Sequence, residues 1–217
     1  MKTKVNLPTK ITITRIALVV ALLVLLFVFE ILGQNGYQGI VLGDSGISLI
    51  HLIACIVFVI ASATDALDGY LARKWHQVTD LGKFLDPIAD KMLVNSLFIF
   101  LCVPSSFAPD QMVVPVFCVI LMVLRDLVVD TMRFVAASKG QVVAANIFGK
   151  LKTVFQMVTI PLVLLNGWPF SLFDSSWGMF DITYLFIYLA TSMSLVSGVI
   201  YVVQNRHVLV SKEETHD

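Results

Sequence analysis

The chain has 217 residues, of which 58% are hydrophobic and 14% are charged, and its formal net charge is zero. Its mean hydropathy of +0.88 lies outside the usual range of soluble domains, so the composition excludes an ordinary water-soluble enzyme and indicates an integral membrane protein. The three cysteines stand singly in apolar stretches, which argues against a disulfide framework or a CxxC metal site.

Several apolar runs approach the roughly 20 residues that a helix needs to cross a hydrocarbon layer about 30 Å thick. We therefore predict an all-α polytopic membrane protein, a single domain over residues 1–217, in which no strand is needed. An N-terminal interfacial segment (1–12) precedes six transmembrane helices, predicted at 13–32, 47–63, 81–103, 113–136, 151–165 and 182–203. The second and fifth runs are short for a full crossing. A cleaved signal peptide is the alternative for the first run, but that run is long for one and lacks a convincing small-x-small cleavage site.

Lysine and arginine residues fall on alternate sides of these runs. The connections after the first, third and fifth runs contain neither residue, whereas the N-terminus, the other connections and the tail (204–217) contain several. Cytoplasmic loops retain positive charge during insertion. We therefore expect a multi-pass protein of the cytoplasmic membrane with both termini in the cytoplasm.

Four aspartates cluster around the second connection, where a membrane helix would not carry them without a function. Asp65 and Asp68 are three residues apart, and Asp86 and Asp90 are four apart, so each pair lies on one helix face. Four acids at close range stay ionised in a low-dielectric site only when something neutralises them. Carboxylates without His or Cys suit Mg²⁺, Mn²⁺ or Ca²⁺, so we predict a divalent metal site here.

The histidines do not offer a competing metal site. None of them shows the i,i+4 or HExxH spacing of a zinc protein, and we interpret them as interfacial or loop residues: His51, His76, His207 and His216.

Two glycines stand one helical turn from the acids. Gly69 follows Asp65 and Gly82 precedes Asp86, so a bulky ligand could approach the backbone beside the carboxylates. The alternative is that the small residues only allow close helix packing.

Together these residues form the pattern Asp65-x2-Asp68-Gly69-x2-Ala72-Arg73-x8-Gly82-x3-Asp86-x3-Asp90. The pattern resembles the signature of the CDP-alcohol phosphotransferase family at all eight defined positions. The resemblance implies transfer of a phosphatidyl group from a CDP-linked lipid to an alcohol, with release of CMP. It also implies two bound ions (Mg²⁺ or Mn²⁺) on the four aspartates, Asp90 as general base, a homodimer, and a CDP pocket that includes Asp68, Gly69, Ala72, Arg73 and Gly82.

The N-terminal segment 6–15 resembles the opening of those family members that make phosphatidylglycerophosphate, typically Asn-x-Pro-Asn-x-Leu-Thr-x-x-Arg, with departures at Thr9 and Ile11. This resemblance implies CDP-diacylglycerol as donor and sn-glycerol 3-phosphate as acceptor. It makes Asn6 a candidate for CDP binding, and Thr12 and Arg15 become available to nucleotide or phosphate. Simple anchoring is the alternative for the threonines.

The second signal for the acceptor is a group of cations in and after the fourth run. We predict that they bind the phosphate of an anionic acceptor: Arg125, Arg133, Lys139, Lys150 and Lys152. A structural alternative pairs Arg125 with Asp126 or Asp130, and Arg133 with Asp130, but leaves the lysines without nearby acids. Snorkelling of the lysines to lipid headgroups is the rival for them.

An anionic acceptor favours glycerol 3-phosphate over serine, although inositol phosphate would also fit. Membrane lipids are further expected partners, and no nucleic acid is expected. A cation transporter would also use intramembrane aspartates. The acids lie near one membrane face without an inverted repeat, however, and a purely structural role would not offset the cost of four clustered acids.

Overall fold

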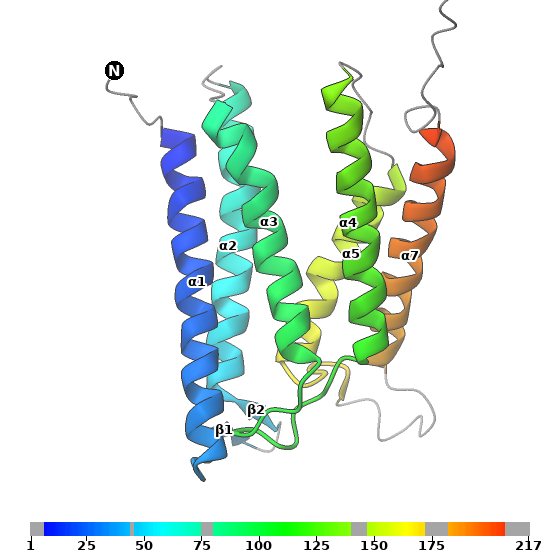
Figure 1. Cartoon of the computed structure of the whole chain (residues 1–217). Helices are drawn as coiled ribbons and strands as arrows, with labels where there is room; N and C mark the ends of the chain where they lie inside the picture. Colours follow the sequence, from blue (N-terminus) through cyan, green and yellow to red (C-terminus); the bar gives the residue numbers. More distant parts are fainter. Residues whose placement is uncertain (1–6, 44–45, 75–79, 140–146, 172–181, 207–217) are drawn as a thin grey trace, which may run out of the picture.

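The structure is a computed structural model that describes residues 7–43, 46–74, 80–139, 147–171 and 182–206 (Figure 1). Within these ranges, the side chains of residues 7–8, 66–73, 80–81 and 83–84 are not described. The described part contains six helices of 18 residues or more: α1 (Leu7–Gln34), α2 (Leu49–Lys74), α3 (Asp80–Leu101), α4 (Val116–Ser138), α5 (Ile147–Leu164) and α7 (Ile182–Gln204).

Helix α1 runs without a break through the expected interfacial segment and the first expected span. Pro8 lies in its first turn, where a missing backbone N–H leaves no hydrogen bond unmade. The polar residues Thr9, Thr12 and Arg15 are buried on this helix. The N-terminal residues are thus part of the helix bundle from Leu7 onward.

The prediction that the chain needs no strand is wrong. Strands β1 (Val41–Leu42) and β2 (Ile47–Ser48) form a short antiparallel hairpin between α1 and α2, at the end of the bundle opposite the N-terminus (Figure 1). Gly43 and Gly46 have φ angles of 59° and 67°, a left-handed conformation that glycine adopts without steric cost. Alternation over two residues is too short a pattern to indicate a strand.

Three of the described helices are long and apolar enough to cross a membrane: Thr9–Gln34, Ile147–Leu164 and Ile182–Gln204. Helix α2 contributes a shorter apolar stretch, Leu49–Asp65, and is longer than the expected second span. Hydropathy therefore supports a membrane protein but does not confirm six spans. The reason is that α3 and α4 carry the charged side chains of the candidate site, which lower their apolar character.

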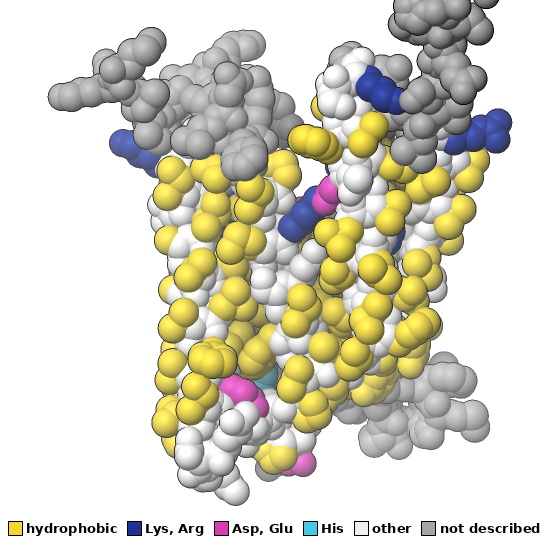
Figure 2. Space-filling view, in the orientation of Figure 1, with side chains coloured by type: hydrophobic (Ala, Val, Ile, Leu, Met, Phe, Trp, Pro, Cys, Tyr) yellow, Lys and Arg dark blue, Asp and Glu magenta, His cyan; other side chains and the backbone are white. Residues whose placement is uncertain are grey.

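The helices pack in two groups. Helix α1 packs on α2 and α3, α7 packs on α4 and α5, and α5 also contacts α2 and α3 (Figure 1). Buried side chains such as Leu26, Phe58, Leu97 and Ile160 form the core between them. Large apolar side chains cover much of the outer surface (Figure 2), as expected of a protein solvated by lipid.

His51 is not the interfacial or loop residue that we expected. It lies within α2 with 0% of its surface exposed, and its ring stacks on Phe107 with 5.2 Å between centroids. Neither ring nitrogen has a hydrogen-bond partner. The other three histidines lie outside the described residues.

Candidate active site

Helix α1 contacts two of the signature aspartates. The hydroxyl of Thr12 donates a hydrogen bond of 2.9 Å to Oδ1 of Asp86 on α3. Three residues later, and so on the same helix face, the guanidinium of Arg15 forms an ion pair with Asp65 on α2. Both α1 side chains are only 2% exposed. From the sequence, Thr12 and Arg15 were expected to be available to a nucleotide or phosphate. The structure shows that they also contact the signature acids Asp86 and Asp65.

The signature residues occupy the end of α2 and the first half of α3. Asp65, Asp86 and Asp90 are partly buried, and Gly82 is buried. The α2 backbone also carries four residues whose side chains lie outside the description: Asp68, Gly69, Ala72 and Arg73. Asn6 lies outside the described residues as well.

The carboxylates match the oxygen ligands that Mg²⁺ and Mn²⁺ prefer, so the donor set fits these ions chemically. Among the described side chains, no three His, Cys, Asp or Glu residues lie close enough together to hold a metal ion. Asp65 and Asp86 each use Oδ1 in their contact with α1, and each has a second carboxylate oxygen. The metal site therefore stays a prediction, with Asp68 among the ligands that the described side chains leave untested.

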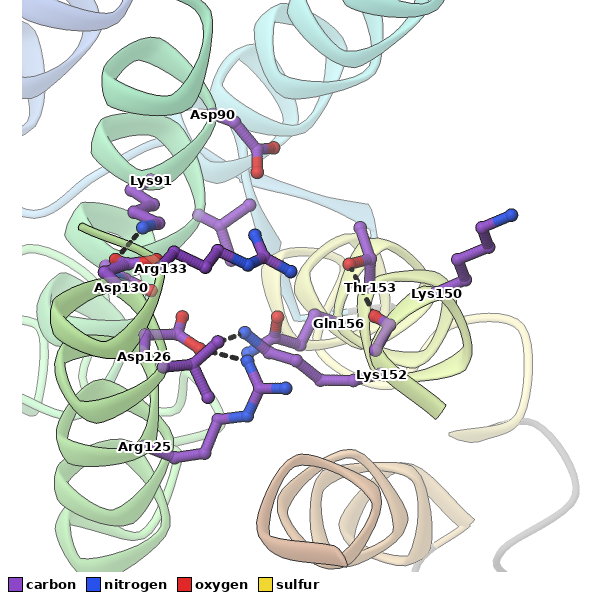
Figure 3. A pocket seen from close by; sticks show the side chains of 14 residues that line it. Asp90, Lys91, Arg125, Asp126, Asp130, Arg133, Lys150, Lys152, Thr153 and Gln156 are labelled. Carbon is purple, nitrogen blue, oxygen red and sulfur yellow. Dashed lines mark hydrogen bonds and ion pairs between the residues drawn. The ribbon is translucent and has the colours of Figure 1, made fainter. Parts of the chain in front are cut away.

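A cavity of about 240 Å³ lies between α3, α4 and α5 (Figure 3). Its lining combines the expected general base with five basic and two further acidic side chains: Asp90, Lys91, Arg125, Asp126, Asp130, Arg133, Lys150 and Lys152. In Figure 2, basic and acidic side chains meet in a hollow between the two helix groups. The lining carries an excess of two positive charges, which suits an anionic ligand.

Asp126 is the centre of a paired cluster in this cavity. Its Oδ1 accepts contacts of 2.5 Å from Lys152 Nζ and 3.0 Å from Arg125 Nη1. Arg125 also donates from Nη2 to Ser197 Oγ at 2.5 Å and from Nε to the Ser194 carbonyl at 3.2 Å. We call these five residues the Asp126 cluster. It joins α4, α5 and α7.

Two of the predicted phosphate ligands therefore already have partners. Pairing of Arg125 with Asp126 was one of the structural alternatives, and the structure shows it. The expectation that Lys152 has no nearby acid is wrong. Asp126 is 26 residues away in the sequence, but it forms an ion pair with Lys152 in the structure.

Gly198 makes room for the cluster on α7. A Cβ atom at this position would lie 2.6 Å from Cγ of Arg125, closer than real Cβ contacts allow. The absence of a side chain at Gly198 therefore lets Arg125 lie across α7 and reach Ser194 and Ser197.

Arg133 stands two helical turns after Arg125 and makes different contacts. Its guanidinium carbon lies 5.4 Å from the centroid of the Tyr201 ring, a cation–π contact. Figure 3 shows the guanidinium extending into the cavity below Asp90. The structural alternative, in which Arg133 pairs with Asp130, is not what the structure shows, because Lys91 of α3 forms the ion pair with Asp130. No acid among the described residues pairs with Arg133.

The two remaining predicted cations differ in position. Lys150 lines the cavity from the first turn of α5, and in Figure 3 its side chain points away from Asp126. Lys139 is the exposed C-cap residue of α4 and is not part of the cavity lining.

Sequence reasoning missed polar residues that complete the lining, namely Lys91, Asn95, Thr153 and Gln156. Lys91 was detectable, because it is a charged residue inside an expected span, the same criterion that singled out the aspartates. Uncharged Asn95, Thr153 and Gln156 carry no comparable signal.

The sequence model for the CDP-alcohol phosphatidyltransferase family matches residues 5–203. The chain belongs to this family. This membership confirms the resemblance inferred from the eight-residue signature. Three relatives of the chain show how far the similarity extends.

A protein of Bacillus subtilis strain 168, named CDP-diacylglycerol--glycerol-3-phosphate 3-phosphatidyltransferase, is 40% identical over 204 residues, which cover 94% of this chain and 97% of the relative. A Mycoplasma pneumoniae protein of the same name is 38% identical, with 92% and 87% covered. An Arabidopsis thaliana protein, named CDP-diacylglycerol--glycerol-3-phosphate 3-phosphatidyltransferase 2, is 30% identical. The match covers 96% of this chain and 83% of that relative. The CDP-alcohol phosphatidyltransferase similarity thus spans nearly the whole chain.

Proposed function

We propose that this chain is a membrane enzyme that transfers a phosphatidyl group from CDP-diacylglycerol to sn-glycerol 3-phosphate, giving phosphatidylglycerophosphate and CMP. The names of its full-length relatives support both the donor and the acceptor. The observation that carries the proposal is the cavity whose lining combines Asp90 with a surplus of basic side chains.

In this reaction the acceptor hydroxyl oxygen forms a bond to the phosphorus that carries diacylglycerol, and the bond from that phosphorus to CMP breaks. Asp90 accepts the hydroxyl proton, since it is the signature acid that lines the cavity. Asp65, Asp68, Asp86 and Asp90 would hold two divalent ions, Mg²⁺ or Mn²⁺. When bound, such ions would spread the charge of the diphosphate and stabilise the departing CMP.

Arg133 is the main candidate for binding the acceptor phosphate, and Lys150 adds positive charge to the lining of the same cavity. The planar fork of Arg133 matches two phosphate oxygens, and it extends into the cavity without an acidic partner among the described residues. Arg125 and Lys152 act mainly through the field of their charges and through the position of the cavity wall, because both are held in ion pairs with Asp126. Lys139, the exposed C-cap residue of α4, would act on incoming anions through its charge.

We further propose that the six helices all cross the membrane, with both termini and the cavity mouth on the cytoplasmic side. The concentration of Lys and Arg side chains toward one end of the bundle supports this orientation (Figure 2). CDP-diacylglycerol would enter from the surrounding lipid. A homodimer remains a prediction from the family resemblance.

The experiment is CMP release by purified protein supplied with CDP-diacylglycerol and Mg²⁺ or Mn²⁺. Glycerol 3-phosphate, inositol phosphate, serine and phosphatidylglycerol are offered in parallel, with Asp90→Asn and metal chelation as controls. We expect release with glycerol 3-phosphate alone, lost in both controls. Release with another alcohol would show that this alcohol is the acceptor in place of glycerol 3-phosphate. Release that survives chelation would show that the reaction needs no divalent metal ion. No release with any alcohol would favour a cation transporter.

A further inference from the structure

Arg15 is a buried cation that is only partly paired. It is 2% exposed on α1, and Nη1 forms its ion pair with Asp65. Its Nε and Nη2 atoms are buried and have no hydrogen-bond partner. A buried charged donor without a partner costs free energy, so these two atoms are candidate donors for a bound anion.

The two unpartnered atoms lie on the same edge of the guanidinium group. The N–H of Nε and one N–H of Nη2 point in parallel, and such a pair of donors can bind two oxygens of one phosphate or carboxylate. Asp65 contacts the guanidinium through Nη1, which leaves this edge free. Arg15 therefore presents a complete two-donor fork in a buried position.

The surroundings of Arg15 indicate which anion the fork would bind. Two of the four signature acids are held by the same face of α1: Asp65 is the ion-pair partner of Arg15, and Asp86 accepts a hydrogen bond from Thr12 one turn earlier. These acids repel an anionic ligand, so a diphosphate needs positive charge beside them. Arg15 supplies such a charge from outside the eight-residue signature.

We propose that Arg15 binds the diphosphate of the CDP-linked donor through Nε and Nη2, while Nη1 keeps its contact with Asp65. This inference rests on the proposed function, because it names a further contact for the donor of that reaction. The competing interpretation is that Arg15 only fastens α1 to α2 through the ion pair.

The test is the affinity of the purified full-length protein for CDP and for cytidine, measured by calorimetry in detergent with Mg²⁺. Arg15→Lys keeps the charge next to Asp65 and removes the fork, and Arg15→Gln removes the charge as well. We expect CDP binding to weaken about 10-fold in the lysine variant and further in the glutamine variant, from the loss of charge-assisted hydrogen bonds. Cytidine binding should not change, and the KM for CDP-diacylglycerol should rise while that for glycerol 3-phosphate does not.

Lys10→Gln is the matched control, since Lys10 is an exposed cation on the same helix. Unfolding temperatures identify which of the two Arg15 variants is folded and can be compared. Wild-type affinity for CDP in a folded Arg15 variant would overturn this inference alone and leave a structural ion pair. Failure of the wild-type protein to bind CDP would overturn the proposed donor, and this inference with it.

Discussion

Arg125 and Arg133 stand eight residues apart on α4 and line the same cavity, yet their surroundings differ. Arg125 is held by Asp126 and two serines of α7, whereas Arg133 has a tyrosine ring beside it and no acidic partner among the described residues. The first arrangement joins three helices. The second leaves a charge available to a ligand. A cation inside a membrane helix is therefore a candidate ligand only after its acidic neighbours have been identified.

The largest expected effect comes from removing the acid at the centre of the Asp126 cluster. Asp126→Ala leaves the buried Lys152 and the largely buried Arg125 without their counter-charge, and breaking a buried ion pair typically costs about 3–5 kcal/mol of stability. Thermal or denaturant unfolding in detergent measures the change. Asp110→Ala, at an exposed acid, is the control and should change stability by less than about 1 kcal/mol. A similar small change for Asp126→Ala would show that the cluster is not structural.

Arg133→Gln should affect catalysis instead of stability. Loss of charge-assisted hydrogen bonds of about 1.5–3 kcal/mol corresponds to a roughly 10- to 100-fold rise in the KM for glycerol 3-phosphate. The unfolding temperature should stay near that of the wild type, and Arg206→Gln, at an exposed arginine after α7, serves as the control. A large loss of stability with an unchanged KM would show that Arg133, like Arg125, has a structural role and does not bind the acceptor.

A substitution at Gly198 tests the packing of Arg125 against α7. Gly198→Ala forces Arg125 to move, because the new Cβ would lie 2.6 Å from its Cγ atom, and such overpacking costs about 1–3 kcal/mol. Gly149→Ala is a matched control: its Cβ would lie 3.9 Å from Nη2 of Arg125, an ordinary contact. We expect unfolding experiments to show a loss for Gly198→Ala and no loss for Gly149→Ala. Equal stability of both variants would contradict the packing described for Arg125.

Thr12→Val is expected to have the smallest effect, on the affinity for the metal ion. The hydroxyl of Thr12 orients Asp86, a proposed metal ligand, and removing the hydrogen bond that supports a metal ligand typically weakens metal binding by about 10-fold or more. Mn²⁺ binding, followed by electron paramagnetic resonance, measures this directly. Thr14→Val is the control, since the exposed Thr14 hydroxyl donates to the carbonyl of Lys10 on the same helix. Unchanged Mn²⁺ affinity in Thr12→Val would show that the contact between α1 and Asp86 does not support metal binding.

The sequence predicted most of the helical architecture because apolar runs and charged interruptions are local signals. It did not predict the β1–β2 hairpin, whose strands have two residues each, or the burial of His51, whose position depends on Phe107. Helix boundaries shifted where charged residues continue a helix past its apolar part, as they do in α2.

For the site, the spacing of the aspartates identified the family, which the family match confirms. The pairing of the cations could not be predicted in the same way. Asp126 meets Lys152 only because α4 and α5 pack together, and Lys91 rather than Arg133 reaches Asp130 from α3. Residues on one helix can be paired from their spacing, but partners on different helices require the packing to be known.

Arg133 is the residue through which the cavity is proposed to bind the phosphate of the acceptor. The decisive measurement is calorimetric titration of glycerol 3-phosphate and of glycerol into the wild type and into Arg133→Gln. We expect the wild type to prefer glycerol 3-phosphate to glycerol, and Arg133→Gln to lose at least about 10-fold of the affinity for the phosphate compound alone. Equal binding of glycerol 3-phosphate by a folded Arg133→Gln protein would contradict this proposal and place the acceptor phosphate elsewhere.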